Sequence, residues 1–328
     1  MIVYLIVKTI CLFTSGGDSP GMNACIRAVV RTALHHGLQV YGIRYGYEGM
    51  INDDFVKMDA KSVANIIHRG GTILKTARSK EFMTPEGMKK AAGNLLRHQI
   101  DGLIAIGGDG TFRGALALQN YCKIPFVGCP GTIDNDLAGS DYTIGFDTAI
   151  NTVVDAVDKI RDTAESDNRI FVVEVMGRDS GLIALYSGVG VGAEGIMIPE
   201  TKNDLTAVMD LLKRSRKDKK SKIILVAEGD EDGGAVVVAE KIKSAFPESD
   251  VRVTILGHVQ RGGAPTCMER VNAARMGHEA VNALLDGRKM EMVGIVNGKI
   301  AFTPLENAVK QHVEPDPKLL SMTKILAS

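Results

Sequence analysis

Residues 102–111 read Gly-Leu-Ile-Ala-Ile-Gly-Gly-Asp-Gly-Thr, an apolar run that ends in a cluster of glycines. The run is short and does not alternate between apolar and polar residues, which is typical of a parallel strand covered on both faces. The three glycines leave side chains out of a place where a phosphate chain can lie against the backbone. This stretch predicts an α/β fold with a ligand site at the carboxyl end of a strand.

Six other runs of the same kind predict further buried strands, at 3–13, 38–44, 126–129, 169–176, 223–227 and 251–256. Helix-like stretches separate them. The clearest are 147–164, where Asp147 or Thr148 is the expected N-cap, and 269–286, where Gly287 is placed as a C-terminal cap. This alternation predicts an α/β architecture with right-handed crossovers.

Length and charge limit the possible classes of protein. The chain has 328 residues, and at about 150 residues per domain this length indicates two domains. Lys plus Arg (39) equals Asp plus Glu (39), so the sequence lacks the basic balance of a nucleic-acid-binding protein. The first apolar stretch is interrupted by Lys8, is too short for a bilayer and lacks a signal-peptide cleavage site. We therefore expect no nucleic-acid partner and no membrane association.

The cysteines indicate a reducing compartment. There are five of them, an odd number, and none forms a Cys-x-x-Cys pair. A disulfide framework and a structural zinc site are both disfavoured by this pattern, so we expect a cytoplasmic protein.

A second glycine cluster follows the first predicted strand. Residues 14–23 read Thr-Ser-Gly-Gly-Asp-Ser-Pro-Gly-Met-Asn and precede a helix. Paired glycines allow backbone N–H groups to turn toward a phosphate, and the helix N-terminus adds a favourable dipole. A tight strand-to-helix turn explains the same residues equally well. No Gly-Lys-Ser/Thr follows, so this is not a P-loop.

The cluster at 107–111 contains Asp109 between glycines. A carboxylate at this place supplies one hard oxygen ligand, and Mg²⁺ is typically held by one or two carboxylates together with substrate phosphates. Asp109 could instead cap a helix that starts near Thr111. A cap does not require glycine on both sides, so we favour a nucleotide site with Mg²⁺.

A third cluster, Pro-Gly-Thr-Ile-Asp-Asn-Asp at 130–136, follows the strand predicted at 126–129. Phosphoryl transfer needs an acceptor for the nucleophile's proton and donors for the phosphoryl oxygens. Asp134 and Thr132 have the chemistry for these two roles. An Asx-turn is the alternative for this segment taken alone, but the combination of three clusters favours a site.

With these clusters, the downstream segments Val-Met-Gly-Arg at 175–178 and Leu-Gly-His-Val-Gln-Arg-Gly-Gly at 256–263 complete a recognisable pattern. The sequence resembles the ATP-dependent 6-phosphofructokinases of the bacterial type from about residue 10 to about residue 285. The segments around Asp134 and Arg261 are the specific ones, because NAD kinases and diacylglycerol kinases also carry an element similar to 107–111.

The resemblance implies two Rossmann-like, three-layer α/β/α domains with mainly parallel sheets and an active site in the cleft between them. The ATP-binding domain would comprise 1–145 and about 262–312. The fructose 6-phosphate-binding domain would comprise 146–261 and about 313–328. The implied reaction transfers phosphate from ATP to the 1-hydroxyl of fructose 6-phosphate, giving fructose 1,6-bisphosphate and ADP.

The resemblance also implies roles for individual residues. Asp134 would be the base, with Thr132, Arg178 and Arg78 also catalytic, and Asp109 would hold Mg²⁺. The nucleotide contacts would be Gly17, Arg78, Ser79, Gly108, Asp109, Gly110 and Thr111. The sugar phosphate contacts would be Thr132, Ile133, Asp134, Met176, Gly177, Arg178, Glu228, His258, Val259, Gln260 and Arg261, with Arg169 and Arg252 reaching in from a neighbouring subunit of a homotetramer.

An effector site between subunits is a further implication. Its residues would be Arg27, Arg31, Arg161, Gly192, Glu194, Lys217, Lys219 and Lys220. Arg27 and Arg31 are four residues apart and would share one helix face. Ala60 and Asn65 stand where some family members place Arg and Asp, so we expect weaker regulation than in those members.

The phosphoryl donor is predicted from two glycines. Family members that use pyrophosphate typically carry Asp at the position of Gly110 and Lys at that of Gly131. A carboxylate would repel the α-phosphate of ATP, and a lysine would neutralise the free end of pyrophosphate. Glycine at both positions favours ATP. A pyrophosphate-dependent phosphofructokinase and a non-catalytic sensor of sugar phosphates or nucleotides are the alternatives.

Overall fold

The fold was analysed in a computed structural model, which describes residues 7–167, 169–202, 204–214, 221–310 and 313–326. The chain divides into two compact units, which are described separately. Unit 1 comprises Met1–Thr132, Asp136–Asp147 and Arg261–His312. Unit 2 comprises Ile133–Asn135, Thr148–Gln260 and Val313–Ser328. Each unit therefore consists of segments that are far apart in the sequence.

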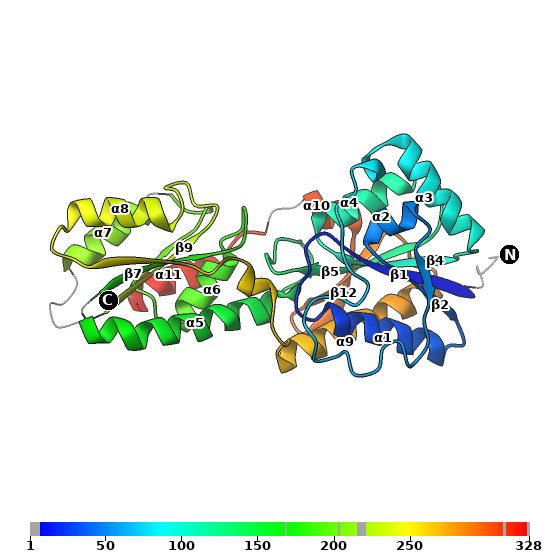
Figure 1. The fold of residues 1–328 in the computed structure, drawn as a ribbon, viewed down its shortest axis with the longest axis horizontal. Coiled ribbons are helices and arrows are strands. Elements are labelled where there is room, and N and C mark those ends of the chain that lie inside the picture. Colours follow the sequence, from blue (N-terminus) through cyan, green and yellow to red (C-terminus); the bar gives the residue numbers. More distant parts are fainter. Residues whose placement is uncertain (1–6, 168, 203, 215–220, 311–312, 327–328) are drawn as a thin grey trace. The chain divides into compact units, whose positions relative to one another are not determined.

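Unit 1 is built on one mainly parallel sheet with the strand order β12-β11-β5-β4-β1-β2-β3, and β6 pairs with β5 (Figure 1). Antiparallel pairing occurs where β3 joins β2 and where β12 joins β11. The strands are β1 (Thr9–Ser15), β2 (Gln39–Ile43), β3 (Phe55–Lys57), β4 (Gly102–Gly107), β5 (Phe126–Thr132), β6 (Ile144–Gly145), β11 (Glu291–Val296) and β12 (Lys299–Pro304).

Helices cover both faces of this sheet, because its central strands are apolar on both sides. In β1, Ile10 and Leu12 pack into one core and Cys11 and Phe13 into the other. The first core is closed by α1 (Met22–His35) and α9 (Cys267–Leu285). The second is closed by α2 (Gly46–Ile51), η1 (Glu81–Met83), α3 (Pro85–Arg97), α4 (Asp109–Leu118) and α10 (Leu305–Lys310). Unit 1 is thus a three-layer α/β/α structure.

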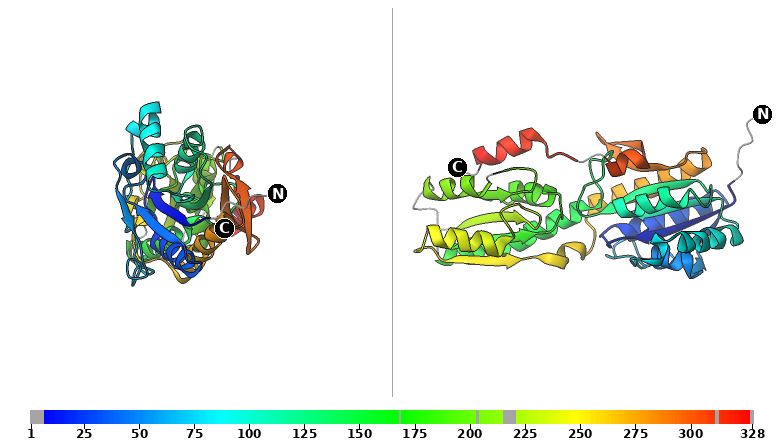
Figure 2. Two further views of the ribbon diagram at one scale, coloured as in Figure 1. Left: turned by 90° about the vertical axis from the view of Figure 1, so that its right-hand side faces the viewer. Right: turned by 90° about the horizontal axis from the view of Figure 1, so that it is seen from above.

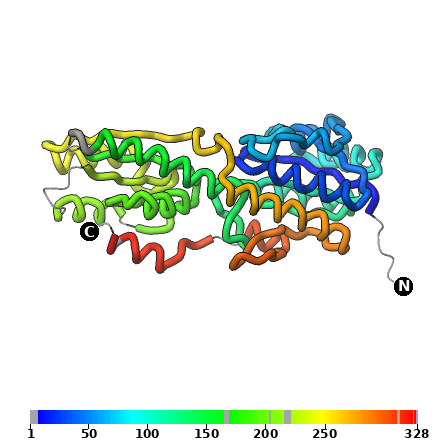
Figure 3. Tube along the Cα trace, turned by 90° about the horizontal axis from the view of Figure 1, so that it is seen from below, coloured from blue at the N-terminus to red at the C-terminus, as the bar shows by residue number. Residues whose placement is uncertain are grey.

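Unit 2 has a wholly parallel sheet with the order β10-β7-β9-β8, formed by β7 (Ile170–Val175), β8 (Gly195–Met197), β9 (Lys222–Ala227) and β10 (Val251–Ile255). β10, yellow in Figure 2, is an edge strand. The helices are α5 (Phe146–Asp167), α6 (Leu182–Gly190), α7 (Asp204–Arg214), α8 (Ala235–Ala245), η2 (Gly257–Arg261) and α11 (Pro317–Leu326). Helices α7 and α8 pack on one face through Val208, Leu212, Val238 and Ile242. Helices α5 and α6 lie along the other face, and α11 lies beside α6 (Figure 3).

The predicted α/β class and parallel sheets are confirmed, with differences in several elements. The strand predicted at 3–13 is shorter, because β1 begins only at Thr9. Thr9 is paired with Gln39 of β2, and Ile10 is paired with Gly102 of β4. Residues 1–6 lie outside the described part. Helix α5 begins at Phe146, so Asp147 and Thr148 lie inside its first turn and neither is its N-cap. Gly287 follows α9 at φ 78°, where it supports the expected left-handed end.

The sequence-based prediction missed β3, β6, β8, β11 and β12. Three of these have only two or three residues, too few for an apolar pattern to be seen. Among the described residues, no helix is long and apolar enough to cross a membrane.

Phe13 tests the second core of unit 1. Its fully buried ring lies edge-on to Tyr47 at 5.0 Å and to Phe126 at 6.3 Å between centroids. Replacing it with alanine leaves a cavity among aromatic rings, so we expect Phe13→Ala to lower the free energy of unfolding by about 3–5 kcal/mol. Urea denaturation measures this change. Leu96→Ala, at an exposed position of α3, is the control, and similar losses in both variants would contradict this packing.

Candidate active site

The strand register brings the three glycine clusters to one edge of the unit 1 sheet. Ser15 of β1 is paired with Gly107 of β4, and Gly107 is paired with Pro130 of β5. All three strands are parallel, so their carboxyl ends meet at the same edge of the sheet. The segments that the sequence analysis singled out one by one are therefore neighbours in space.

The first two clusters are also bound to each other. Thr111 Oγ1 donates a hydrogen bond to the Ser15 carbonyl oxygen at 3.2 Å. A Cβ on Gly107 would lie 2.4 Å from Thr111 Oγ1 and 2.7 Å from that same carbonyl, so this backbone contact requires glycine. The Thr111 carbonyl in turn accepts from the Tyr47 hydroxyl at 2.6 Å. Burial raises the pKa of Tyr47 well above its usual value, so the hydroxyl stays protonated and donating.

Asp109 is the first residue of α4, and Gly108 is the N-cap without a side-chain hydrogen bond. The Asp109 carboxylate is 43% exposed, and its Oδ2 lies 3.5 Å from Arg113 Nε. The described residues contain no group of three or more His, Cys, Asp or Glu side chains placed to hold a metal. An accessible carboxylate beside glycine backbone fits an ion that takes most of its other ligands from substrate phosphates and water.

The third cluster is where the chain passes between units. Strand β5 continues to Thr132, whose carbonyl accepts from Thr143 Oγ1 at 2.6 Å. Ile133 to Asn135 belong to unit 2. There Asp134 is buried, its carbonyl accepts from Ser180 Oγ at 2.8 Å, and its Oδ2 lies 3.6 Å from Arg178 Nε. The structure therefore pairs the predicted base with a predicted phosphoryl-binding arginine.

A hydrogen-bonded turn holds the backbone of Arg178 in place. Gly177 has φ 145° and Arg178 has φ 52°, and both backbone N–H groups donate to Glu228 Oε1, at 3.3 and 2.9 Å. Glu228 follows β9, whose neighbour β7 leads directly into this turn. Its carboxylate thus fixes the backbone from which Arg178 extends, in addition to any contact with a substrate.

The segment after β10 joins the same group. Met176 N–H donates to Gln260 Oε1 at 3.2 Å, and Gln260 itself is fully buried. His258 and Val259, which precede it in η2, are exposed. Six predicted residues of unit 2 are therefore connected through hydrogen bonds, close contacts or the chain itself: Asp134, Met176, Gly177, Arg178, Glu228 and Gln260.

Arg261 and the residues at 78–79 belong to unit 1. The Arg261 side chain lies against Gly17, where a Cβ would be 1.9 Å from Nη1. Its Nε is buried, and no hydrogen-bond partner for it is found in the described part of the chain. Arg78 is exposed. Ser79 Oγ accepts a hydrogen bond from Phe82 N–H at 3.1 Å, at the start of η1.

Arg169 and Arg252 are brought together at the sheet edge of unit 2. Arg169 Nε lies 2.9 Å from Asp250 Oδ2, and Arg252 Nε lies 2.9 Å from Asp250 Oδ1. The hydrogen bond from Arg169, with that from Arg252, holds the pKa of Asp250 below its usual value.

The predicted effector residues divide between the units. Arg27 and Arg31 lie on α1 of unit 1. In unit 2, Arg161 Nη2 donates to the Val191 carbonyl at 2.6 Å, next to Gly192, and Glu194 is buried two residues further on. Lys217, Lys219 and Lys220 lie outside the described residues.

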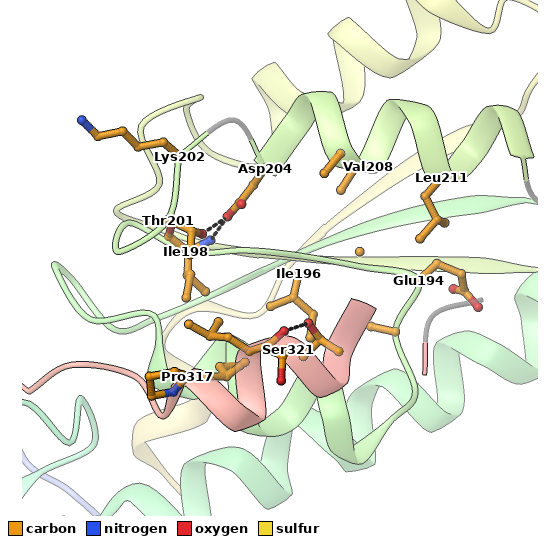
Figure 4. Close-up of a pocket in the computed structure, with 16 residues that line it drawn as sticks. Glu194, Ile196, Ile198, Thr201, Lys202, Asp204, Val208, Leu211, Pro317 and Ser321 are labelled. Atoms are coloured by element: carbon orange, nitrogen blue, oxygen red, sulfur yellow. Dashed lines mark hydrogen bonds between the residues drawn. The ribbon is translucent and has the colours of Figure 1, made fainter. Parts of the chain in front are cut away.

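A cavity of about 520 Å³ lies in unit 2 between α6, β8, α7 and α11 (Figure 4). Its wall is mainly apolar, with Ile196, Val208 and Leu211 among the residues that line it. Among the predicted site residues that the structure describes, Glu194 alone lines this cavity. The cavity is therefore separate from the Asp134–Arg178 group.

Sequence reasoning missed the residues that support the site. Tyr47 and Ser180 bind backbone carbonyls of Thr111 and Asp134, and Thr143 binds that of Thr132. A hydroxyl that binds a distant carbonyl carries no signal in the sequence, because its partner is set only by the fold.

Unit 1 contributes parallel strand ends with glycine clusters and an accessible carboxylate, and unit 2 contributes buried Asp134 with Arg178 beside it. These are the kinds of group that phosphoryl transfer uses. The family model described as phosphofructokinase matches residues 9–284, and the chain belongs to this family.

Similar proteins agree with this assignment. The chain is 52% identical to an ATP-dependent 6-phosphofructokinase of Cytophaga hutchinsonii, over 98% of both chains. It is 53% identical to ATP-dependent 6-phosphofructokinase 1 of Thermus thermophilus, over 98% of this chain and all of the relative. A solved phosphofructokinase of Saccharomyces cerevisiae matches with a TM-score of 0.86 and 38% identity, over 92% of this chain and 45% of the yeast chain.

Glu228 tests how the Arg178 turn is held. Glu228→Ala removes the carboxylate that accepts from two backbone N–H groups, and losing a hydrogen bond to a charged acceptor costs about 1–3 kcal/mol. We expect the amides of Gly177 and Arg178 to exchange with solvent about 5- to 150-fold faster. Hydrogen exchange read by mass spectrometry measures this change. Glu231→Ala, at an exposed residue of the same loop, is the control, and unchanged exchange in Glu228→Ala would refute the role.

Proposed function

We propose that the protein phosphorylates D-fructose 6-phosphate at the 1-hydroxyl with ATP, giving fructose 1,6-bisphosphate and ADP, the committed step of glycolysis. The observation that carries the proposal is buried Asp134 with Arg178 beside it. Asp134 follows almost directly on β5, the strand that ends beside the other two glycine clusters. Full-length relatives at about half identity carry the name ATP-dependent 6-phosphofructokinase.

The nucleotide is bound by residues of unit 1 in this proposal, and the sugar phosphate mainly by residues of unit 2. Gly17, Arg78, Ser79 and the stretch Gly108, Asp109, Gly110 and Thr111 contact ATP. Glycine backbone accommodates the phosphates, and Arg78 spreads charge along them. Asp109 holds Mg²⁺, which neutralises charge on the phosphate chain when it is bound. That the active site lies between the two domains stays a prediction.

The acceptor sugar is bound by the hydrogen-bonded group around Glu228. The contacts proposed are Thr132, Ile133, Asp134, Met176, Gly177, Arg178, Glu228, His258, Val259, Gln260 and Arg261. Arg252 lies on β10 and Arg169 directly before β7, and we assign both to the sugar phosphate of a neighbouring subunit in a homotetramer. Their shared partner, Asp250, keeps both guanidinium groups at one place on the sheet edge.

Asp134 acts as the general base. Its carboxylate takes the proton of the sugar 1-hydroxyl as the oxygen attacks the γ-phosphorus of ATP. The Arg178 guanidinium, 3.6 Å from that carboxylate, and the Thr132 hydroxyl donate to the phosphoryl oxygens during transfer. Because the pair is held by the Ser180 and Glu228 contacts, it needs little rearrangement when substrates bind.

ATP is the donor that the two diagnostic glycines favour over pyrophosphate. A Cβ on Gly110 would meet nothing within 4 Å, so this position offers open space at the start of α4. A Cβ on Gly131 would come within 3.0 Å of Ile106 and Met22 side-chain atoms and 3.1 Å of the Gly107 nitrogen. A lysine there would have to displace packed neighbours. A non-catalytic sensor is disfavoured because Asp109, Asp134 and Arg178 are all present.

An effector site and a cytoplasmic location complete the proposal. The effector residues are Arg27, Arg31, Arg161, Gly192, Glu194, Lys217, Lys219 and Lys220. The site is weakened because Ala60 and Asn65 stand where some family members place Arg and Asp. An enzyme that draws on the ATP and sugar phosphates of glycolysis belongs in the cytoplasm.

The reaction is tested by identifying the product. Purified protein, ATP, Mg²⁺ and fructose 6-phosphate labelled with ¹³C at carbon 1 should give a carbon 1 signal coupled to phosphorus. Phosphorylation at another carbon, or no sugar bisphosphate at all, would refute the proposal.

Asp134 variants test the base. We expect Asp134→Asn, which keeps the size and the backbone contact to Ser180, to lower kcat by about 10²–10⁴-fold with KM values near those of wild type. Asp134→Ser should lose at least as much. Steady-state kinetics measure both. If Asp134→Asn retained near-normal kcat, Asp134 would not be the base.

Gly110→Asp tests the donor. The open space at this position accepts the new side chain, so we expect the thermal unfolding midpoint to change little. The carboxylate should repel the nucleotide phosphates and raise KM for ATP about tenfold or more, since about 1.4 kcal/mol corresponds to that factor. Gly110→Asn, of the same size but neutral, is the matched control. Equal effects of Asp and Asn would show that charge is not the reason.

A further inference from the structure

A long irregular loop in unit 1 is anchored by buried side chains. Residues 58–80 contain neither helix nor strand, yet Met58, Val63, Ile66 and Leu74 are buried in the core beneath α1 and α9. Loops longer than about 12–15 residues without secondary structure are uncommon in compact domains and are often functional. This one ends at Arg78 and Ser79.

Asn23 fixes the middle of the loop. It lies in the first turn of α1, is 1% exposed, and uses its whole amide on the loop backbone. Its Nδ2 donates to the carbonyls of Arg69 and Gly70 at 3.1 and 3.2 Å, and its Oδ1 accepts from Ile73 N–H at 2.8 Å. One buried side chain therefore sets the path of residues 69–73.

Thr14 fixes the next part of the loop. Its hydroxyl donates to the Lys75 carbonyl at 2.8 Å and is 2.9 Å from Thr72 Oγ1, while Thr72 Oγ1 accepts from Leu74 N–H at 3.2 Å. Thr14 precedes Ser15 in β1, and Asn23 ends the same glycine cluster. The glycine cluster at 14–23 and the loop at 69–75 are therefore joined by a continuous set of hydrogen bonds.

Gly70 brings this body against the segment that carries Arg261. A Cβ on Gly70 would lie 2.3 Å from the Gly263 carbonyl oxygen and 3.2 Å from the carbon that bears it. On the other side, the Arg261 guanidinium lies on Gly17. Residues 261–263 therefore contact two glycines: the Arg261 side chain lies against Gly17, and the Gly263 backbone lies so close to Gly70 that a side chain there would displace it.

We propose that Gly70 and Asn23 are positioning residues for Arg261, and that the loop at 69–73 supports the nucleotide and the sugar phosphate sites together. Asn23 holds the loop, Gly70 allows it to touch Gly263, and this contact sets the backbone from which Arg261 reaches the sugar phosphate. The proposal rests on the proposed function, in which Arg261 binds fructose 6-phosphate and Arg78 binds ATP.

Hydrogen exchange on the wild-type protein gives the first test. Fructose 6-phosphate without nucleotide should slow exchange in 258–263 and also in 69–73, where no contact with the sugar is proposed. Unphosphorylated fructose and the helix 85–97 are the controls. Protection of 258–263 alone would overturn the inference. If neither segment responds, fructose 6-phosphate is not bound, and the proposed function fails together with the inference.

Steady-state kinetics give the second test. In Gly70→Ala the Gly263 carbonyl must move, so we expect KM for fructose 6-phosphate to rise about 10- to 100-fold, with a smaller change in KM for ATP and in kcat. In Asn23→Ala both KM values should rise, because the loop also carries Arg78. Gly93→Ala is the matched control, since a Cβ there meets nothing within 4 Å.

The two KM values separate positioning from a purely structural role. Lower thermal stability with unchanged KM values in Gly70→Ala would overturn the inference. So would a rise confined to KM for ATP. If Gly70→Ala does not fold, hydrogen exchange on the wild type decides the question.

Discussion

The parallel register of β1, β4 and β5 is the constraint on which the proposed site depends. It places Ser15, Gly107 and Pro130 side by side, so that three loops leave the sheet at one edge. Gly107 permits the close approach of the first two loops, because a Cβ there would clash with the Ser15 carbonyl and with Thr111, which donates to that carbonyl. The glycines therefore have two roles: they allow the loops to pack, and they leave backbone N–H groups available to an anion.

Unit 2 contributes a different kind of order, in which an acidic side chain holds backbone. Glu228 accepts from two consecutive N–H groups of a turn with left-handed geometry, and that turn carries the arginine that lies beside Asp134. The Asp134 carboxylate is buried, and a buried carboxylate is costly unless it is paired or hydrogen-bonded. Arg178 lies beside it, and the Glu228 contacts fix the backbone of this arginine before a substrate arrives, which favours phosphoryl transfer.

The sequence predicts the fold class because its central strands are apolar without alternation, and it predicts the site because the clusters follow those strands. Short elements such as β6 and β8 leave no pattern. The hairpin of β11 and β12 was missed although its turn, Asn297-Gly298, with both residues at positive φ, is a recognisable hairpin signal. The part played by Asn23 was not predictable, because its partners lie 46 to 50 residues away.

The central claim is that the carboxyl edge of β1, β4 and β5 binds a nucleoside triphosphate, which phosphorylates a sugar phosphate. The most direct test compares the initial rate of fructose 1,6-bisphosphate formation from fructose 6-phosphate with ATP and with pyrophosphate, at equal donor and Mg²⁺ concentrations. The account predicts turnover with ATP and none above background with pyrophosphate. Turnover with pyrophosphate that equals or exceeds that with ATP, or no turnover with either donor, would contradict it.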